Sequence, residues 1–578
     1  MSLVLAFLGF FVAVFLPGSV LYKLSERYFK HDVFFPNVWV YVIVCFGLSL
    51  VFNFFMVSLL VWLHLYTHSI LISLTFLEIL GFLWVYKREL VSGLKCLEFD
   101  SHMQELIYFA GIGICIYVFC KKFGLDIFYA WDSVVSWNRW AGEWASGKFV
   151  LNEGGYAQIY PILLSLGYVL SSKISDFQGI GVTIYWYFAL MGLLGCVFLL
   201  FDKNNLKLSA LGFVVLAFFY IVYFAIKQRE FHVGYVDMPV SLVILLSALC
   251  LLRASFETSQ KDVRFYLYLG ALLAGVSAEI KQSGLFWCVM YIIGLLYFWR
   301  FSYFTLSLKV FGVCVGIIIF LCAPWILIAL YKKLFLSVDA TNIQHTWQEI
   351  YQGKSYLERL SHALTKYYQM SVLFFLSLIS LFSKRFAFFG VVGVVYFLLW
   401  GCLLSYDLRN LQGGLPMMIL ALSGGVWSML NSRTFFTLLE FLHKRLALIL
   451  LLGVIATSLR LPFVQEKILT IEQGGRINIG GRDTNELVLA TFKHKGIKPI
   501  ITDNQLLVYA LGFDRKYYEH FSFSQDTRAF EKFLSTYMEP SFYVLLQNDY
   551  VGYYKEFFEE NNLVILGSSG YYTLLERE

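Results

Sequence analysis

The stretch YAQIYPILLSLGYVLS, residues 156–171, decides the fold, because the side on which every later loop lies depends on whether this run crosses a membrane. A spanning helix needs about 20 mainly apolar residues. This run is shorter and contains Pro161 and Gly167. We therefore expect it to form a short helix that lies at the membrane interface without crossing.

The distribution of basic residues supports the same choice. If residues 156–171 do not cross, the loops placed inside hold 18 Lys and Arg, whereas the short loops placed outside hold 4. Such an excess on the cytoplasmic side is typical of membrane proteins. The inside loops are 22–36, 87–102, 202–207, 253–264, 300–309, 384–385 and 431–445, and the short outside loops are 64–68, 227–236, 281–282 and 406–411.

The composition excludes a protein that is soluble over most of its length. Of the 578 residues, 59% are hydrophobic and 15% are charged, against about 25% charged residues in soluble domains. Residues 464–578 differ, since 28 of these 115 residues are charged. The net charge of +6 arises from basic residues in the membrane part. Such residues anchor cytoplasmic loops, so we expect no nucleic-acid partner.

The pattern predicts a mainly α fold, a polytopic membrane bundle of about 14 spans with a small C-terminal soluble α/β domain. The expected spans are near 2–21, 38–63, 69–86, 103–120, 180–201, 208–226, 237–252, 265–280, 283–299, 310–330, 371–383, 386–405, 412–430 and 446–462. Positive charge follows the first span, which places the N-terminus outside. The long segments 121–179 and 331–370 and the α/β domain then also lie outside.

The first long outside segment contains FGLDIFYAWDSVVSWNRWAGEWASGKF, residues 123–149. Asp126 and Asp132 lie close to a membrane exit, where an acidic side chain is costly and a functional role is the default interpretation. Trp137, Trp140 and Trp144 share one face of a helix. They form either an interfacial aromatic belt or a wall for a lipid or a sugar.

Ionisable residues also occur in the short outside loops. Asp237 opens a span, with Arg229 nearby, and either caps that helix or serves a site. Glu279 and Lys281 flank a tight hairpin, where a local ion pair is the alternative to a functional role.

The last of these loops contains Asp407 and Arg409. Arginine suits phosphate because of its fork of donors, whereas a snorkelling side chain is the alternative. We expect the loops to converge on one polar site at the outer leaflet. The sequence has no zinc-binding helix motif, nucleophile elbow or glycine-rich phosphate loop, which argues against ATP-driven transport and hydrolases. The ten Cys form no disulfide framework.

This arrangement resembles the GT-C superfamily of polyprenyl-phosphate-sugar-dependent glycosyltransferases, in the bacterial branch related to protein O-mannosyltransferases and lipid A aminoarabinose transferases. The similar features are Trp131-Asp132-Ser133, the Tyr160-Pro161 helix, Gly234-Tyr235-Val236-Asp237-Met238-Pro239, Lys281-Gln282-Ser283-Gly284, Asp407-Leu408-Arg409 with Pro416, and the soluble tail. The resemblance divides the chain into extra N-terminal helices (1–102), a GT-C-like catalytic domain (103–463) and an extracytoplasmic α/β domain (464–578). Gln282 departs from the acidic or Asn residue that relatives often show.

The resemblance implies transfer of a sugar from a polyprenyl monophosphate to an acceptor such as lipid A, a cell-surface glycan or a protein, by inverting displacement at the plasma (inner) membrane. By analogy, Asp132 is the expected base, with Asp126 as the fallback and Asp237 in support. The expected phosphate-binding residues are Arg409, Lys281 and Arg229, and the residues expected to line the sugar or acceptor are Trp131, Trp137 and Tyr160. No cofactor is required, although Asp132 and Asp237 are able to share a divalent cation.

Two other functions remain open at this point. A flippase or transporter of lipid-linked sugars needs a polar route through the bilayer, whereas the charges here gather at the membrane faces. A glycan polymerase or ligase would use a diphosphate-linked donor and depend on basic residues in segment 331–370.

Overall fold

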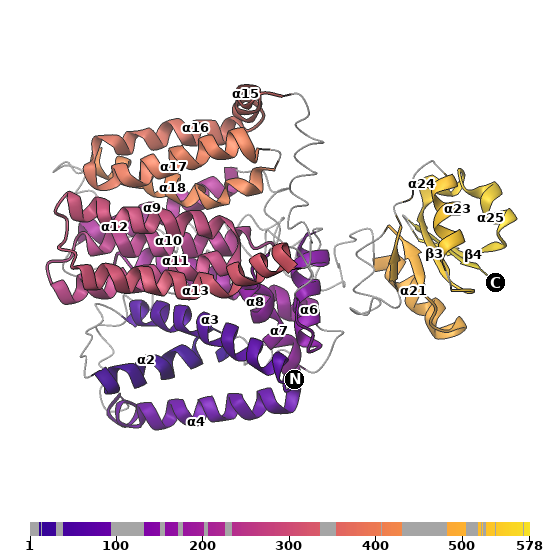
Figure 1. Ribbon diagram of the computed structural model, residues 1–578, viewed down its shortest axis with the longest axis horizontal. Coiled ribbons are helices and arrows are strands. Elements are labelled where there is room, and N and C mark those ends of the chain that lie inside the picture. The colour runs from indigo at the N-terminus through magenta and orange to yellow at the C-terminus, as the bar shows by residue number, and fades with distance from the viewer. Residues whose placement is uncertain are drawn as a thin grey trace, which may run out of the picture.

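The structure is a computed structural model that describes most of the chain. The described residues are 11–12, 14–29, 38–93, 132–150, 156–171, 177–201, 206–225, 234–335, 354–405, 407–429, 482–503, 518–521, 523, 527–537, 539–569 and 572–577. They form a helical bundle and a small α/β unit (Figure 1).

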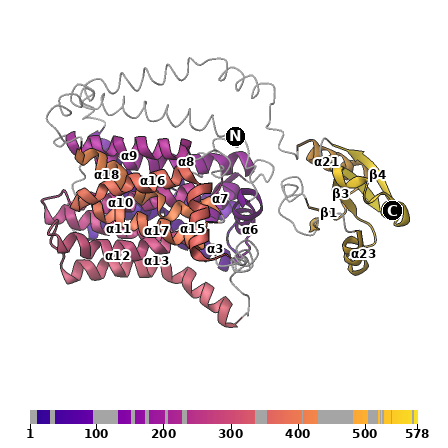
Figure 2. The ribbon, with the colours of Figure 1, turned by 90° about the horizontal axis from the view of Figure 1, so that it is seen from above.

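The bundle is built from long apolar helices that run side by side (Figure 2). Their bounds are α2 (Leu16–Phe29), α3 (Val38–Trp62), α4 (His68–Gly93), η1 (Ser133–Asn138), α6 (Arg139–Ala145), α7 (Ile159–Ser171), α8 (Phe177–Phe198), α9 (Leu206–Ala225), α10 (Asp237–Ala254), α11 (Gln260–Ile280), α12 (Ser283–Arg300), α13 (Leu308–Phe335), α15 (Tyr356–Lys366), α16 (Tyr368–Ser377), η3 (Leu378–Phe382), α17 (Lys384–Leu403), η4 (Leu408–Gly413) and α18 (Leu415–Met429). Among the described residues, seven helices are long and apolar enough to cross a membrane, or eight if the bent pair 356–366 and 368–382 forms one span.

Helix α10 lies at the centre of the bundle. All of its residues from Asp237 to Ala254 are buried, and it packs against α8, α11, α12, α18 and η4. A helix that is apolar all round is covered either by other helices or by lipid, and the burial of α10 shows that other helices cover it here. The first residue of α10 is therefore held firmly at the end of the bundle.

The expected number of 14 spans is not confirmed. Spans 103–120 and 446–462 lie outside the described residues. The expected span 2–21 also differs, because α2 begins at Leu16 and continues to Phe29. Lys23 is therefore helical rather than in a loop, and it pairs with Glu26 one turn later, at 2.5 Å.

Helix α7 contains most of residues 156–171. Its 13 residues make it about 20 Å long, too short to span a bilayer core of about 30 Å. It lacks the exposed polar face of an interfacial helix, however, because every residue from Ala157 to Leu170 is buried. Helices α3, α4, α6, α8 and α11 enclose it, so it is part of the bundle interior.

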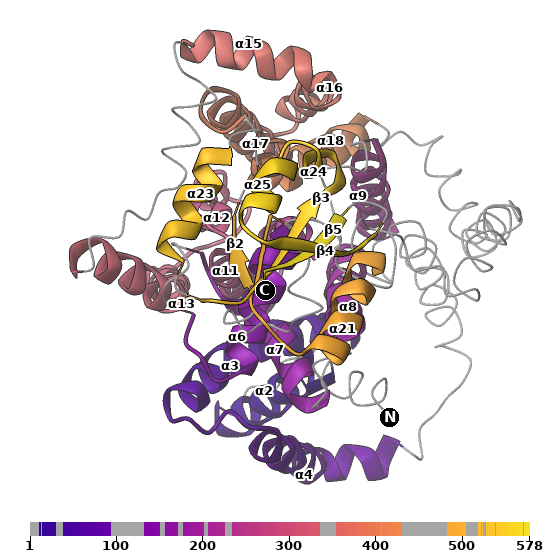
Figure 3. The ribbon, with the colours of Figure 1, turned by 90° about the vertical axis from the view of Figure 1, so that its right-hand side faces the viewer.

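The three N-terminal helices lie together at one edge of the bundle, opposite α15, α16 and α17 (Figure 3). Helix α3 attaches them to α7, α8 and α11. Gly18 allows α2 to approach α3 closely, because a Cβ at this position would overlap with the carbonyl of Cys45. The expected extra helices thus form an integral layer of the bundle.

The short loops expected outside meet at one end of the bundle. Tyr66, in the loop before α4, hydrogen-bonds Ser165 of α7 at 2.9 Å. Lys281 reaches Asp237 at the start of α10. Arg409 of η4 contacts Asp132 beside η1, and η1 packs on α7.

The α/β unit contains one five-stranded sheet. Its elements are α21 (Arg482–Lys495), β1 (Ile500–Thr502), β2 (Tyr518–His520), α23 (Thr527–Thr536), β3 (Tyr543–Gln547), α24 (Asn548–Val551), α25 (Lys555–Glu560), β4 (Leu563–Ser568) and β5 (Tyr572–Arg577). The strand order is β2-β1-β3-β5-β4. Strands β2, β1 and β3 are parallel, whereas β5 is antiparallel to β3 and β4.

Apolar side chains alternate between the two faces of this sheet, as expected for a sheet that is covered on both faces. In β3, Val544 and Leu546 join one apolar cluster, and Tyr543 and Leu545 join the other. A small α/β unit, as expected from the sequence, is therefore present in the described part of the tail.

We expect Gly284→Ala to destabilise the α11–α12 hairpin that carries Lys281. A Cβ at Gly284 would overlap with the backbone of Ser277 and Ala278, and such overpacking costs about 1–3 kcal/mol. The matched control is Gly312→Ala in α13, where no atom lies within 4 Å of the added Cβ. Melting of the purified variants in detergent should show a loss for the first only, and equal melting temperatures would contradict the close approach.

Candidate active site

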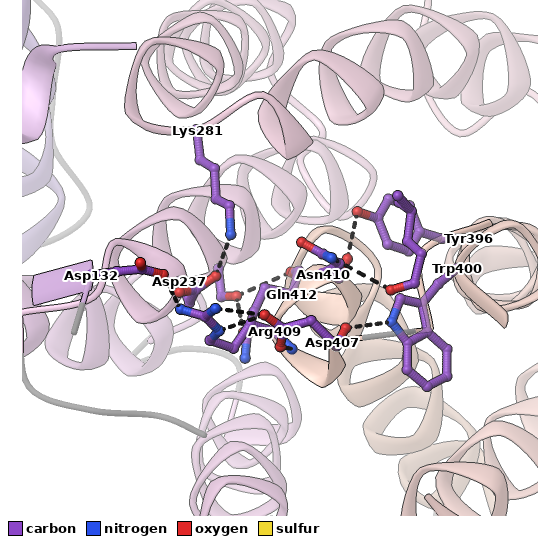
Figure 4. Close-up of polar contacts among 11 residues, drawn as sticks. Asp132, Asp237, Lys281, Tyr396, Trp400, Asp407, Arg409, Asn410 and Gln412 are labelled. Atoms are coloured by element: carbon purple, nitrogen blue, oxygen red, sulfur yellow. Dashed lines mark hydrogen bonds and ion pairs between the residues drawn. The ribbon is translucent and has the colours of Figure 1, made fainter. Parts of the chain in front are cut away.

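Four segments that are distant in the sequence bring charged residues together at one end of the bundle. Asp132 precedes η1, Asp237 begins α10, Lys281 joins α11 to α12, and Arg409 lies in η4. Figure 4 shows the Arg409 guanidinium between Asp132 and Asp407, with Lys281 reaching Asp237 beside it. The structure thus brings together four of the residues selected from the sequence.

Arg409 is the centre of this group. Its Nη1 contacts Asp132 Oδ2, and its Nε and Nη2 donate to Asp407 Oδ2 at 2.8 and 2.6 Å. The guanidinium also lies 4.6 Å from the centre of the Tyr235 ring. Burial alone would lower the pKa of Arg409, but the hydrogen bond and charge of Asp407, with the charges of Asp132 and Asp237, raise it above its usual value. The group remains a cation.

The turn that carries Arg409 is held by its own residues and by α17. Asp407 Oδ1 accepts the backbone N–H of Arg409 at 2.9 Å, which caps η4. Trp400 Nε1 donates to the Asp407 carbonyl, and Tyr396 Oη donates to the Asn410 carbonyl, both at 3.0 Å. Both donors come from α17, so the guanidinium has a fixed support.

Two further contacts fix the second half of this turn. Ser241 of α10 donates to the Gln412 carbonyl at 3.0 Å. Gly413 and Gly414 pass against Tyr396, where a Cβ at either position would overlap with the aromatic side chain. The central helix therefore positions both Asp237 and the Arg409 turn.

Asp237 and Lys281 form a second ion pair at this end. Lys281 Nζ lies 2.5 Å from Asp237 Oδ1, and the two side chains are 17% and 3% exposed. Val236 rather than Asp237 is the N-cap of α10, so the helix-cap alternative for Asp237 is wrong. Lys281 does not form the local ion pair with Glu279. It pairs with Asp237 of α10 instead, and Glu279 is buried.

The described Trp residues of segment 132–150 and Tyr160 of α7 pack inward. Trp137 is 5% exposed and packs edge-on against Trp140, at 4.9 Å between ring centres. Tyr160 is fully buried. Trp144 donates to Gln158 at 3.0 Å. These residues join η1 and α6 to α7 and stiffen the segment that follows Asp132, and the buried rings of Trp137 and Tyr160 do not form an open wall.

Three of the residues selected from the sequence, Asp126, Trp131 and Arg229, lie outside the described residues. Within the described residues, no group of three His, Cys, Asp or Glu side chains is placed to hold a metal ion.

The sequence analysis did not assign roles to Asp407, Tyr235 or Trp400. The Asp-x-Arg spacing of Asp407 and Arg409 was a usable signal, because an aspartate often bonds the backbone N–H two residues later. The contacts of Tyr235 and Trp400 depend on helix packing and leave no local signal.

No protein-family model matches the chain, and no curated protein matches it. Among solved structures, ArnT from Cupriavidus metallidurans bound to undecaprenyl phosphate is similar, with a TM-score of 0.51 and 12% identity over 82% of this chain and 97% of that one. ArnT in the apo state gives 0.50 and 11% identity, over 82% and 98%.

The chain has the ArnT fold. Nearly the whole length of ArnT is matched. At this identity the likeness concerns the ArnT fold alone, and the chemistry has to be argued from the residues.

We expect Lys281→Met to destabilise the protein more than the double variant Asp237→Asn/Lys281→Met does. Removing Lys281 alone leaves a buried carboxylate without its cation, which costs about 3–5 kcal/mol, whereas removing both charges avoids most of that cost. Melting temperatures of the two single variants and the double variant form the test. Additive losses would show that Asp237 and Lys281 are not coupled.

Proposed function

We propose that the protein is an integral-membrane glycosyltransferase, which moves a sugar from a polyprenyl-monophosphate donor to an extracytoplasmic acceptor by inverting displacement. The observation that carries this proposal is the contact of Asp132 with Arg409 at one end of an ArnT-like bundle. It joins a proton acceptor to an anion-binding group. The ArnT structure that binds undecaprenyl phosphate supports the donor class.

The proposed reaction needs a base and a group that holds a leaving phosphate. The acceptor hydroxyl attacks the anomeric carbon from the face opposite the phosphate, and its proton passes to Asp132. The bond between the anomeric carbon and the phosphate oxygen breaks, and the polyprenyl phosphate leaves with both electrons. Arg409 would bind its charge through planar, forked donors. These steps require no metal or cofactor.

Lys281 and Asp237 act beside this centre in the proposal. Lys281 is a second cation for the phosphate, and Asp237 holds its ammonium at 2.5 Å. Asp237 supports the acceptor or the base. Asp126 remains the alternative base, and Arg229 remains a further phosphate ligand.

We further propose that the site faces the extracytoplasmic side of the plasma (inner) membrane, together with the N-terminus and the α/β unit. The bias of Lys and Arg toward the opposite loops supports this orientation. Lipid A, a cell-surface glycan or a protein is the acceptor class. The Asp132 side chain is 35% exposed, which leaves the proposed base accessible to the acceptor.

The orientation can be tested by cysteine labelling in intact cells. We expect Leu65→Cys to react with a membrane-impermeant maleimide, because residue 65 is exposed at the site end. Thr305→Cys, exposed between α12 and α13 at the other end, should react only after the cells are opened. The native cysteines set the background, and labelling in the reverse order would contradict the orientation.

We expect Asp132→Asn to slow glycosyl transfer by about 10² or more, because a positioned base contributes about 10²–10⁴-fold. The assay follows transfer from labelled polyprenyl-phosphate sugars to membrane extract. Asp262→Asn, at the opposite end of α11, removes the same charge and should leave transfer unchanged.

Two results would contradict parts of this proposal. Equal rates for wild type and Asp132→Asn would exclude Asp132 as the base and favour Asp126 or Asp237. No transfer by wild type from any donor in a broad panel would favour a flippase or a diphosphate-dependent ligase.

A further inference from the structure

We propose that the ion pair between Asp132 and Arg409 is a latch that the donor phosphate replaces. Arg409 contacts the proposed base in this structure, and when the donor binds, its phosphate takes the place of Asp132 on Arg409. The carboxylate is thereby released to accept the proton of the acceptor. This inference rests on the proposed function and deepens it, by stating how donor binding prepares the base.

The two carboxylates on Arg409 are held in different ways. Asp407 lies two residues away and takes two hydrogen bonds from the guanidinium on one oxygen. Its other oxygen takes the backbone N–H of Arg409. Asp132 comes from a segment 277 residues away and contacts Nη1 alone. Asp407 is therefore the fixed anchor of the guanidinium, and Asp132 is the partner that can be exchanged.

The surroundings of Arg409 allow Nη1 to change its partner while the rest of the site stays in place. Trp400 holds the Asp407 carbonyl from α17, and the Tyr235 ring lies 4.6 Å from the guanidinium carbon. Both supports remain when Nη1 changes its partner. Asp132 is the most exposed of the three charged side chains, at 35% against 25% for Arg409 and 23% for Asp407. The Nη1 edge is thus the side from which a ligand can arrive.

The exchange resolves a conflict within the site. A proton that moves to Asp132 while it contacts Arg409 removes the negative charge of an ion pair, so the transfer gives up that attraction. A phosphate on Arg409 supplies the replacement anion before the proton moves. Arginine binds phosphate and carboxylate through the same donor geometry, so the two anions compete for one edge. The base therefore becomes available only when the donor is in place.

The test measures binding of undecaprenyl phosphate to the full-length protein in nanodiscs. Asp132→Asn removes the competing anion, and we expect it to bind the lipid about three- to tenfold more tightly. Asp407→Asn makes the same change of charge on the same arginine. We expect this variant to bind more weakly than wild type, because its guanidinium loses the anchor.

A third variant separates the latch from simple charge repulsion. If Asp132 only repels the phosphate, Asp132→Asn still tightens binding when Arg409→Gln is also present. If Asp132 competes for Arg409, the gain disappears in that background. We expect Arg409→Gln alone to weaken binding and the double variant to bind as weakly as Arg409→Gln does. Melting curves check that each variant folds, and Asp132→Ser replaces Asp132→Asn if the latter does not.

The outcomes distinguish this inference from the proposed function. Binding by wild type with no gain in Asp132→Asn would overturn the latch and leave the donor class standing. An equal gain in Asp132→Asn and Asp407→Asn would also overturn the latch, because it would reflect net charge alone. No binding of undecaprenyl phosphate by wild type would reject the proposed donor and the latch together.

Discussion

The Arg409 guanidinium joins the parts of the molecule that meet at the site. It lies in the turn between α17 and α18, and it contacts Asp132 from the segment before η1. A cation that is partly withdrawn from water, as the 25% exposed Arg409 is, is stabilised by carboxylates beside it. Asp407 provides such a carboxylate from within the same turn. The position of Asp132 relative to the bundle therefore depends on its attraction to the charge of Arg409, which lies far along the chain.

The central helix α10 fixes the positions of the groups that take part in this interaction. It is buried along its whole length, so its first residue, Asp237, has a fixed position next to Lys281. Its Ser241 also bonds the turn that carries Arg409. Both ion pairs are thus placed by one rigid element. Because each pair joins different helices, the site exists only when the bundle is assembled.

Several features of this arrangement follow from local sequence signals. The positions of most helices follow from runs of apolar residues, because a backbone in lipid has to satisfy its own hydrogen bonds. The gathering of the short loops that carry Tyr66, Lys281 and Arg409 at one end follows from the count of basic residues. The burial of Trp137 and the enclosure of α7 do not follow in this way. The sequence of an apolar helix does not show whether lipid or protein covers it.

The sequence by itself determined the class of fold, the loops that meet at one end and the charged residues those loops carry. These are properties of hydropathy and charge along one segment at a time. Only the tertiary structure decided the partners: Lys281 with Asp237 rather than Glu279, and Arg409 between Asp407 and Asp132. Partner choice depends on distances between helices that are remote in the chain. Those distances are set by how the helices pack around α10, and no single segment encodes them.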